Sequence, residues 1–146
     1  MRRYLVVAHQ TLSSQELVDE LTSRAAEEES TFHLLVPPTH GEGLTWTERH
    51  DRELAKEHLD EAIERFAAAG LTVTGEVGHD SPVASVDDLL RRDHHADAYD
   101  EVIVSTLPVT LSRWLKMDAP SRIQRLTTLP VHHVIGHPAT AMSANR

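Results

Sequence analysis

Short apolar runs alternate along this chain with longer segments whose apolar residues recur at helical spacing, and this alternation restricts the fold most strongly. The apolar runs cover residues 4–8, 32–36, 71–77, 100–106 and 131–135. The periodicity of the segments between them predicts helices, so the expected order is β-α-β-α-β-α-β-α-β. Connections of this length allow right-handed crossovers. The sequence therefore predicts an α/β fold with a single doubly wound, five-stranded parallel sheet and helices on both faces.

The apolar patterns of individual runs predict their places in the sheet. Tyr4–Ala8 and Val102–Val104 are unbroken apolar stretches, which is typical of central strands covered on both faces. Leu71–Val77 alternates apolar and polar residues, which is typical of a half-exposed edge strand. These patterns favour the strand order 3-2-1-4-5, in which the first and fourth strands are neighbours where the winding reverses.

Capping residues predict where several helices begin. Ser13 followed by Glu16, and Thr45 followed by Glu48, have the spacing of a capping box. Asp118, with a proline two positions later, predicts the start of the last helix.

Charge and composition narrow the classes of partner and the compartment. The chain has 146 residues, a net charge of −9 and no cysteine. The negative charge argues against nucleic acid and anionic membranes as partners, and the lack of cysteine excludes disulfides and thiol chemistry. The opening apolar run ends at Ala8, too short for a signal sequence or a membrane span, so we expect a cytoplasmic protein. We expect one domain over residues 1–136 and a flexible tail over residues 137–146.

Polar residues follow the two strands that should meet at the reversal of winding. His9, Gln10 and Thr11 follow the first strand, and Ser105 and Thr106 end the fourth. In doubly wound sheets the ligand crevice opens between the carboxyl ends of these strands, so these side chains are candidates for binding a small polar ligand. Ordinary strand-to-helix turns also favour serine and threonine, and the sequence leaves this alternative open.

Histidine is abundant, but its placement gives little support to a metal site or to catalysis. His132 and His133 are neighbours in a predicted strand, so they should point to opposite faces and not chelate one ion together. The histidines at 94 and 95 do not have the spacing of a ligand pair either. His9 and Ser105 form the one plausible base and nucleophile pair. We therefore expect no metal, no catalytic residue and a protein that is not an enzyme.

Several segments together resemble the universal stress protein family. The resemblance rests on YLVVAHQTLSS, FHLLVP, VGHDSPVASV, DEVIVSTLPVTLSRWLKMDAPSRI and LPVHHVIG, and it extends from Tyr4 to Gly136. It implies the fold predicted above and a regulatory or stress-response role.

The family's nucleotide-binding residues are replaced in this chain. The resemblance places the family's acidic residue at His9, its three loop glycines at Val104, Leu107 and Met117, and its phosphate-binding hydroxyl at Asp118. Glycine allows backbone N–H groups to approach a phosphate without interference from a Cβ, whereas a carboxylate repels the phosphate. Residues 100–118 contain no glycine, so shifting the register by one residue does not restore the motif. The sequence therefore argues against ATP or AMP bound in the usual family manner and predicts no cofactor.

Side chains of the loop after the fourth strand offer an alternative way to hold a phosphate. Ser112, Arg113 and Lys116 could bind an anion together with Ser105 and Thr106. Exposed basic pairs more often form a solvated surface. The alternative function is thus a nucleotide or anion sensor that uses these side chains.

The last strand is expected to mediate self-association. In the family this strand often forms a two-fold dimer, so the resemblance implies a homodimer through Val131, His133 and Ile135, with a further protein partner unknown. A histidine at 132 or 133 near the dimer axis would make association depend on pH.

Overall fold

The computed structural model describes residues 1–38, 48–79, 81–93 and 98–137. Five parallel strands form one sheet in the order β3-β2-β1-β4-β5, so the predicted α/β fold and strand order are confirmed. Along the chain the elements are β1 (Arg2–Val7), α1 (Gln15–Glu27), β2 (Ser30–Val36), α2 (Glu48–Ala68), β3 (Thr72–Val77), α3 (Pro82–Asp93), β4 (Glu101–Thr106), α5 (Arg113–Lys116), α6 (Ala119–Leu126) and β5 (Val131–Ile135).

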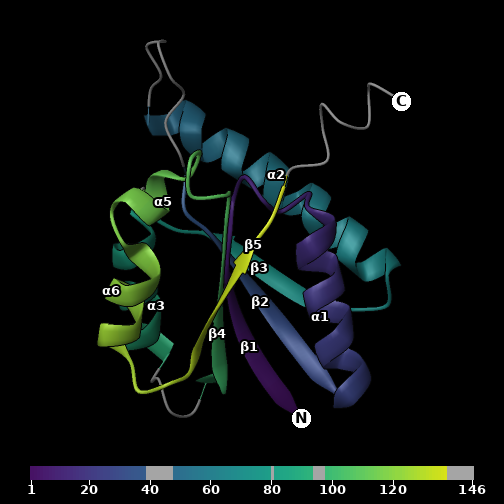
Figure 1. Ribbon diagram of the computed structural model, residues 1–146. Helices are drawn as coiled ribbons and strands as arrows, with labels where there is room; N and C mark the ends of the chain where they lie inside the picture. Colours follow the sequence, from purple (N-terminus) through teal and green to yellow (C-terminus); the bar gives the residue numbers. More distant parts are fainter. Residues whose placement is uncertain (39–47, 80, 94–97, 138–146) are drawn as a thin grey trace.

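Helices cover both faces of the sheet, with α1 on one side and α3 and α6 on the other (Figure 1). Successive strand residues point to opposite faces, so β1 contributes Tyr4 and Val6 to the core under α1 and α2, and Leu5 and Val7 to the core under α3 and α6. All four side chains are buried. This explains why the first strand is apolar without interruption.

One predicted helix start differs from the observed one, and one short helix was not predicted. Ser14, and not Ser13, caps α1, because its hydroxyl accepts a hydrogen bond from the backbone N–H of Leu17 at 3.2 Å. The sequence analysis also missed α5, a single turn capped by Ser112. Thr45 lies outside the described residues.

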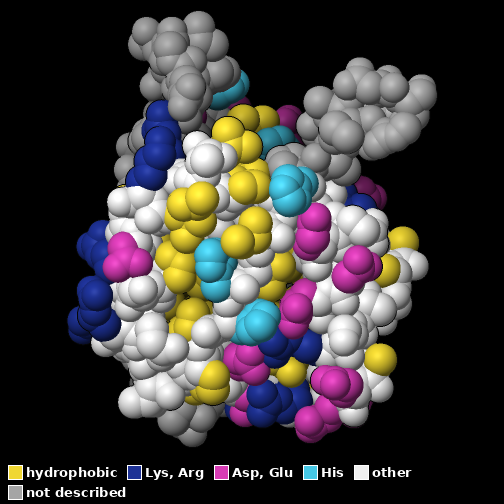
Figure 2. Space-filling view, in the orientation of Figure 1, with side chains coloured by type: hydrophobic (Ala, Val, Ile, Leu, Met, Phe, Trp, Pro, Cys, Tyr) yellow, Lys and Arg dark blue, Asp and Glu magenta, His cyan; other side chains and the backbone are white. Residues whose placement is uncertain are grey.

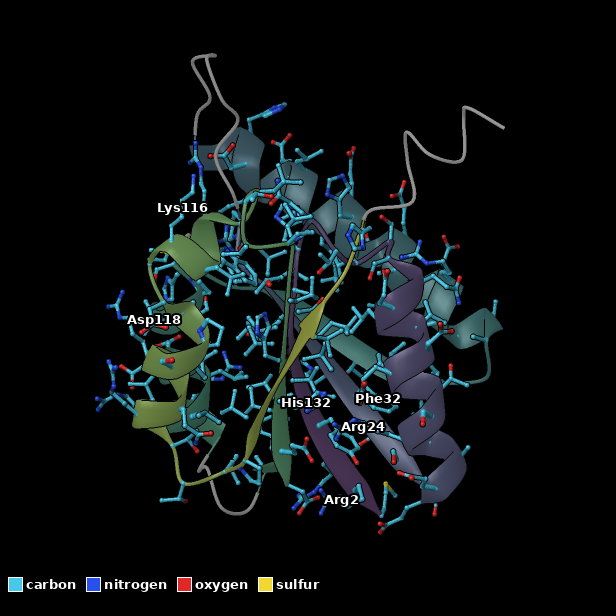
Figure 3. The ribbon with its side chains drawn as sticks, viewed as in Figure 1. Arg2, Arg24, Phe32, Lys116, Asp118 and His132 are labelled. Atoms are coloured by element: carbon cyan, nitrogen blue, oxygen red, sulfur yellow. The ribbon has the colours of Figure 1, made fainter. Side chains whose placement is uncertain are left out.

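The end of the sheet opposite the strand carboxyl ends carries an ion-pair network that lines a groove of about 470 Å³. Glu101 accepts from Arg2 at 3.2 Å and from Arg24 at 2.7 Å, and both guanidinium groups lie over the ring of Tyr4. Figure 3 labels the two arginines at this end of the molecule, far from Lys116. In doubly wound sheets, ligand sites form at the other end, where the strands have their carboxyl ends.

The chain leaves β5 through a contact with the start of α1. The backbone N–H and the imidazole of His137 each lie 3.1 Å from a carboxylate oxygen of Glu16, and the hydrogen bond from this N–H helps to lower the pKa of Glu16. The rest of the predicted tail lies outside the described residues. Among the residues that are described, no helix has the length and apolar character needed to cross a membrane.

Candidate functional site

The ends of β1 and β4 are joined by a hydrogen bond between two buried hydroxyl groups. The two strands pair in parallel, and the Thr11 Oγ1 and Ser105 Oγ atoms lie 2.6 Å apart. Both side chains are almost completely removed from solvent. The fold thus brings two predicted site residues together, although they are 94 positions apart, and each hydroxyl already has a partner inside the protein.

His9 is also buried and is bonded to a histidine that the sequence analysis did not single out. Its Nε2 lies 2.9 Å from Nδ1 of His58 on α2. Burial, together with the neighbouring His58, lowers the pKa of His9 to about 4, and this net value includes the opposing effects of the Pro37 backbone and the Asp51 carboxylate. His9 is therefore a neutral imidazole at neutral pH, in the place where the family resemblance expects a carboxylate.

A helical stripe on α2 could have revealed His58 from the sequence. Asp51, Ala55 and Ala62 are buried, and with His58 they follow one another at spacings of three or four residues. Such spacing places residues on one face of a helix. None of these residues was named as a candidate from the sequence, so the polar residues on the inner side of this helix were missed.

The remaining residues after β1 and β4 separate in space. Gln10 is exposed. Thr106 is buried and its Oγ1 lies 2.7 Å from Nε2 of His133 on β5. The base and nucleophile pair considered for His9 and Ser105 is not supported, because His9 bonds to His58 while Ser105 bonds to Thr11.

The basic residues after β4 lie on the surface turn α5. Ser112 is buried, and its hydroxyl accepts the backbone N–H of Leu115 at 3.1 Å, so it serves as a helix cap. Trp114 is only 8% exposed and packs into the core beneath α3 and α6. Arg113 and Lys116 are exposed. The predicted site therefore divides into a buried group at the strand ends and an exposed cationic pair on α5.

Asp118 has the left-handed backbone conformation that glycine adopts most easily. Its φ is 56°, and no other non-glycine residue in the described part of the chain has a positive φ. Its side chain makes no capping hydrogen bond to α6. If the family's motif is aligned one residue later, its third glycine position falls on Asp118. The backbone conformation of Asp118 agrees with that alignment.

The histidines of β5 point to different partners. The imidazole of His132 lies 3.7 Å from a carboxylate oxygen of Glu20, whereas His133 faces Thr106. Burial lowers the pKa of His133, and the neighbouring His132 adds to this effect. Within the described residues, no three histidine, aspartate or glutamate side chains are arranged to hold a metal ion. The histidines at 94 and 95 lie outside that part of the chain.

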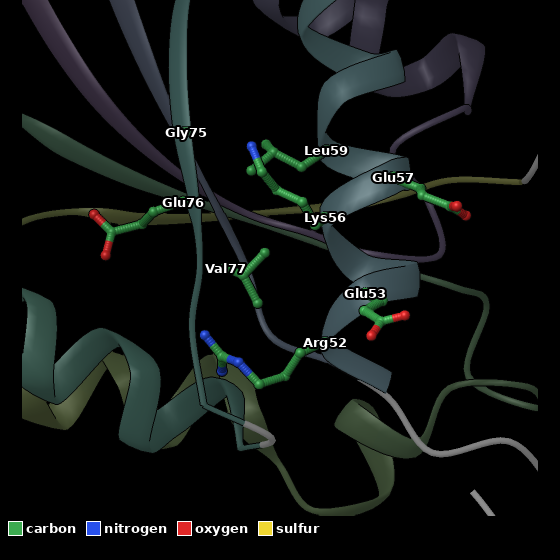
Figure 4. Close-up of a pocket in the computed structure, with 8 residues that line it drawn as sticks. All are labelled: Arg52, Glu53, Lys56, Glu57, Leu59, Gly75, Glu76 and Val77. Carbon is green, nitrogen blue, oxygen red and sulfur yellow. The ribbon is translucent and has the colours of Figure 1, made fainter. Parts of the chain in front are cut away.

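Two grooves border the strands at either end of the sheet order. A groove of about 1010 Å³ lies between α2 and β3 (Figure 4), and its lining includes Arg52 and Lys56 of α2 and Gly75, Glu76 and Val77 of β3. Arg52 donates to the Gly78 carbonyl and Lys56 pairs with Asp60. A groove of about 450 Å³ lies between α1 and β5 and is lined by carboxylates of α1 and by His132 and His133. Neither groove is lined by the residues predicted to bind a ligand.

Comparison with known proteins yields matches among solved structures. A universal stress protein in complex with cAMP aligns with a TM-score of 0.60 and 14% identity, covering 93% of this chain and 98% of that one. A universal stress protein from Archaeoglobus fulgidus gives a TM-score of 0.61 and 12% identity over 92% of this chain and 93% of that one.

A plant protein of the same family is similar at a comparable level. The universal stress protein family protein from Arabidopsis thaliana with AMP bound gives a TM-score of 0.58 and 10% identity over 94% of this chain and 93% of that one. No protein-family model and no curated protein matched the sequence. Since these similarities in structure extend over nearly the whole chain, the protein has the fold of the universal stress proteins.

Proposed function

We propose that this chain is a universal stress protein-like regulatory domain that acts in stress response in the cytoplasm and does not bind ATP in the usual family manner. The observation that carries the proposal is the closed state of the strand ends. Thr11 and Ser105 bond to each other at 2.6 Å, and His9 bonds to His58 at 2.9 Å. A ligand that entered between β1 and β4 would have to break these hydrogen bonds or bind to other groups of the protein.

The loop after β4 supports the same proposal from the phosphate side. Residues 100–118 offer no glycine backbone to a phosphate. Asp118 instead places an exposed carboxylate at the start of α6. A like charge next to a phosphate costs about 1–4 kcal/mol at plausible effective dielectrics.

A second candidate function is a nucleotide or anion sensor that binds through side chains. Its support is that two of the similar structures contain cAMP and AMP, and that Arg113 and Lys116 are exposed on α5. In this case the phosphate would lie on the surface turn, outside the buried strand ends.

We also propose that the protein forms a homodimer through β5. The strand is at the end of the sheet order, and Ile135 is 47% exposed. Val131 and His133 are partly exposed. An apolar strand at the edge of a sheet needs protection or pairing, which a second copy of the chain would provide.

Calorimetric titration with ATP, AMP and cAMP distinguishes the two candidate functions. The first proposal predicts no saturable heat with any of the three nucleotides. Saturable micromolar ATP binding would contradict it, and loss of that binding in an Arg113→Ala/Lys116→Ala variant would establish the sensor. Native mass spectrometry of the freshly purified chain tests the dimer, since a monomer mass would contradict the proposed association.

A further inference from the structure

Exposed apolar side chains are concentrated in the segment that contains α5. In the described residues, the large hydrophobic side chains with high exposure are Met1, Val109, Leu111, Met117 and Ile135. Three of them fall within nine consecutive residues, with exposed fractions of 67% for Val109, 65% for Leu111 and 41% for Met117. Apolar side chains that gather on a surface mark an interaction site more often than scattered ones do.

The charge of the same segment is opposite to that of the whole protein. Residues 107–126 contain four cationic side chains and one acidic side chain, in a chain with a net charge of −9. The cations are Arg113, Lys116, Arg122 and Arg125, and all four are exposed. Figure 2 shows lysine and arginine side chains along the α5–α6 edge, beside hydrophobic side chains that extend toward β5. The segment thus offers apolar contacts next to positive charge.

Internal contacts hold this segment in one shape. The backbone N–H groups of Leu111 and Ser112 both donate to the carbonyl of Pro108, at 2.8 and 3.0 Å. Ser112 caps α5, and Trp114 anchors the turn in the core. An arrangement that is fixed before binding loses less conformational entropy when a partner docks.

We propose that this cationic apolar surface, formed by Val109, Leu111, Arg113, Lys116 and Met117, binds an acidic amphipathic segment of another protein. Carboxylates of the segment would face the two basic side chains, and its apolar residues would cover the exposed hydrophobic ones. The inference does not depend on whether the strand ends bind a nucleotide.

The charge pattern of the molecule argues against two other partners for this surface, namely a second copy of the chain and an anionic membrane. Within the described residues, a second copy offers α1 carboxylates beside a single exposed large hydrophobic side chain, Ile135, which could not cover all three exposed hydrophobic side chains of this surface. An anionic bilayer is broad and flat, so on this face it would also meet the acidic side chains on the side of α1 (Figure 2), a helix that carries Glu16, Asp19 and Glu20. A narrow peptide segment avoids that repulsion.

Selection from a random peptide library tests the proposal without a known partner. Displayed peptides of about 16 residues, enough for four helical turns, are selected on the immobilised full chain. We expect enriched sequences to combine aspartate or glutamate with leucine or phenylalanine. No enrichment, or enrichment of basic peptides, would overturn the proposal.

The best enriched peptide is then measured by fluorescence anisotropy against matched variants. Arg113→Glu/Lys116→Glu is expected to weaken binding by at least about tenfold, and Leu111→Ser by about fivefold. Lys56→Glu changes an exposed cation on α2 and is expected to leave affinity within about twofold. Equal losses in the α5 and α2 charge variants would overturn the proposal, as would binding to anionic vesicles in preference to the peptide or displacement of the peptide by a second copy of the chain.

Discussion

The residues predicted to form one ligand site belong to two regions with opposite properties. At the strand ends, Thr11, Ser105 and His9 are buried and bonded to partners inside the protein. On α5, Arg113 and Lys116 are exposed on a turn that is anchored by the buried Trp114. The first region is packed like a protein core, and the second is exposed to solvent.

This difference shows how a fold can persist while the chemistry of its usual site changes. The chain has the fold of the universal stress proteins over nearly its whole length, and in its sheet β1 and β4 are neighbours. Since the strand ends are occupied by side chains of the chain itself, the surface proposed to bind a partner lies outside them. The following predictions test the contrast between the two regions.

Substitution of Trp114 within α5 and of Leu111 just before it should give very different losses of stability. Trp114→Ala removes a side chain that is only 8% exposed and should lower the free energy of unfolding by about 3–5 kcal/mol. Leu111→Ser alters a side chain that is 65% exposed and should change it by less than about 0.5 kcal/mol. Urea denaturation measures both. Comparable losses for the two variants would mean that Leu111 is part of the core.

The buried His9 should make stability depend on pH. Its pKa is about 4 in the folded protein, below the value of about 6.5 expected in the unfolded chain. Between these values the unfolded chain binds a proton that the folded protein resists, so stability falls as the pH falls from 6.5 to 4, by up to about 3 kcal/mol. Above pH 6.5 His9 is neutral in both the folded and the unfolded chain, so its protonation no longer lowers the stability.

A His9→Asn variant separates this effect from the titration of carboxylates. Urea denaturation of both proteins between pH 7 and 4 should show a steeper decrease for the parent protein, because the carboxylates titrate similarly in both. Parallel curves would show that His9 titrates normally and is not held neutral by burial.

The bond between Thr11 and Ser105 should appear as a coupling between two substitutions. Either Thr11→Val or Ser105→Ala leaves one buried hydroxyl without its partner and should cost about 1–2 kcal/mol. The double variant should cost less than the sum, with a coupling of about 1 kcal/mol in a double-mutant cycle. Strictly additive losses would mean that the hydroxyl groups are not bonded to each other.

The smallest expected effect is at Asp118, where α5 meets α6. Its φ of 56° disfavours a side chain, and its carboxylate makes no capping bond. Its pairing with Arg125 is long, at 3.9 Å, and exposed. Asp118→Gly should therefore raise the free energy of unfolding by about 0.5–1 kcal/mol, measured by urea denaturation. A loss of stability would show that the carboxylate contributes more than its conformation costs.

The sequence was sufficient to predict the sheet because strand order follows from local apolar patterns. The uninterrupted run of β1 and the alternation in β3 correspond to their central and edge places. The candidate site was less predictable, because its bonds join distant segments. The partner of His9 comes from α2, and sequence spacing cannot indicate which ring nitrogen meets which partner.

The short turn α5 illustrates a second limit of the sequence analysis. Four residues are too few for a helical period to be recognised. Leu111 and Trp114 have similar apolar character in the sequence, yet one is exposed and the other buried, because only Trp114 reaches the core between the sheet and α6. Burial of this kind depends on tertiary packing.

Nuclear magnetic resonance of the isotope-labelled chain during titration with ATP tests most directly whether the strand ends are closed. The account predicts no saturable change in the backbone signals of His9, Thr11 and Ser105, whose side chains are bonded internally. Weak, salt-sensitive changes confined to Arg113 and Lys116 agree with it, because these residues are exposed. Saturable shifts at His9, Thr11 and Ser105 with a micromolar midpoint would contradict it.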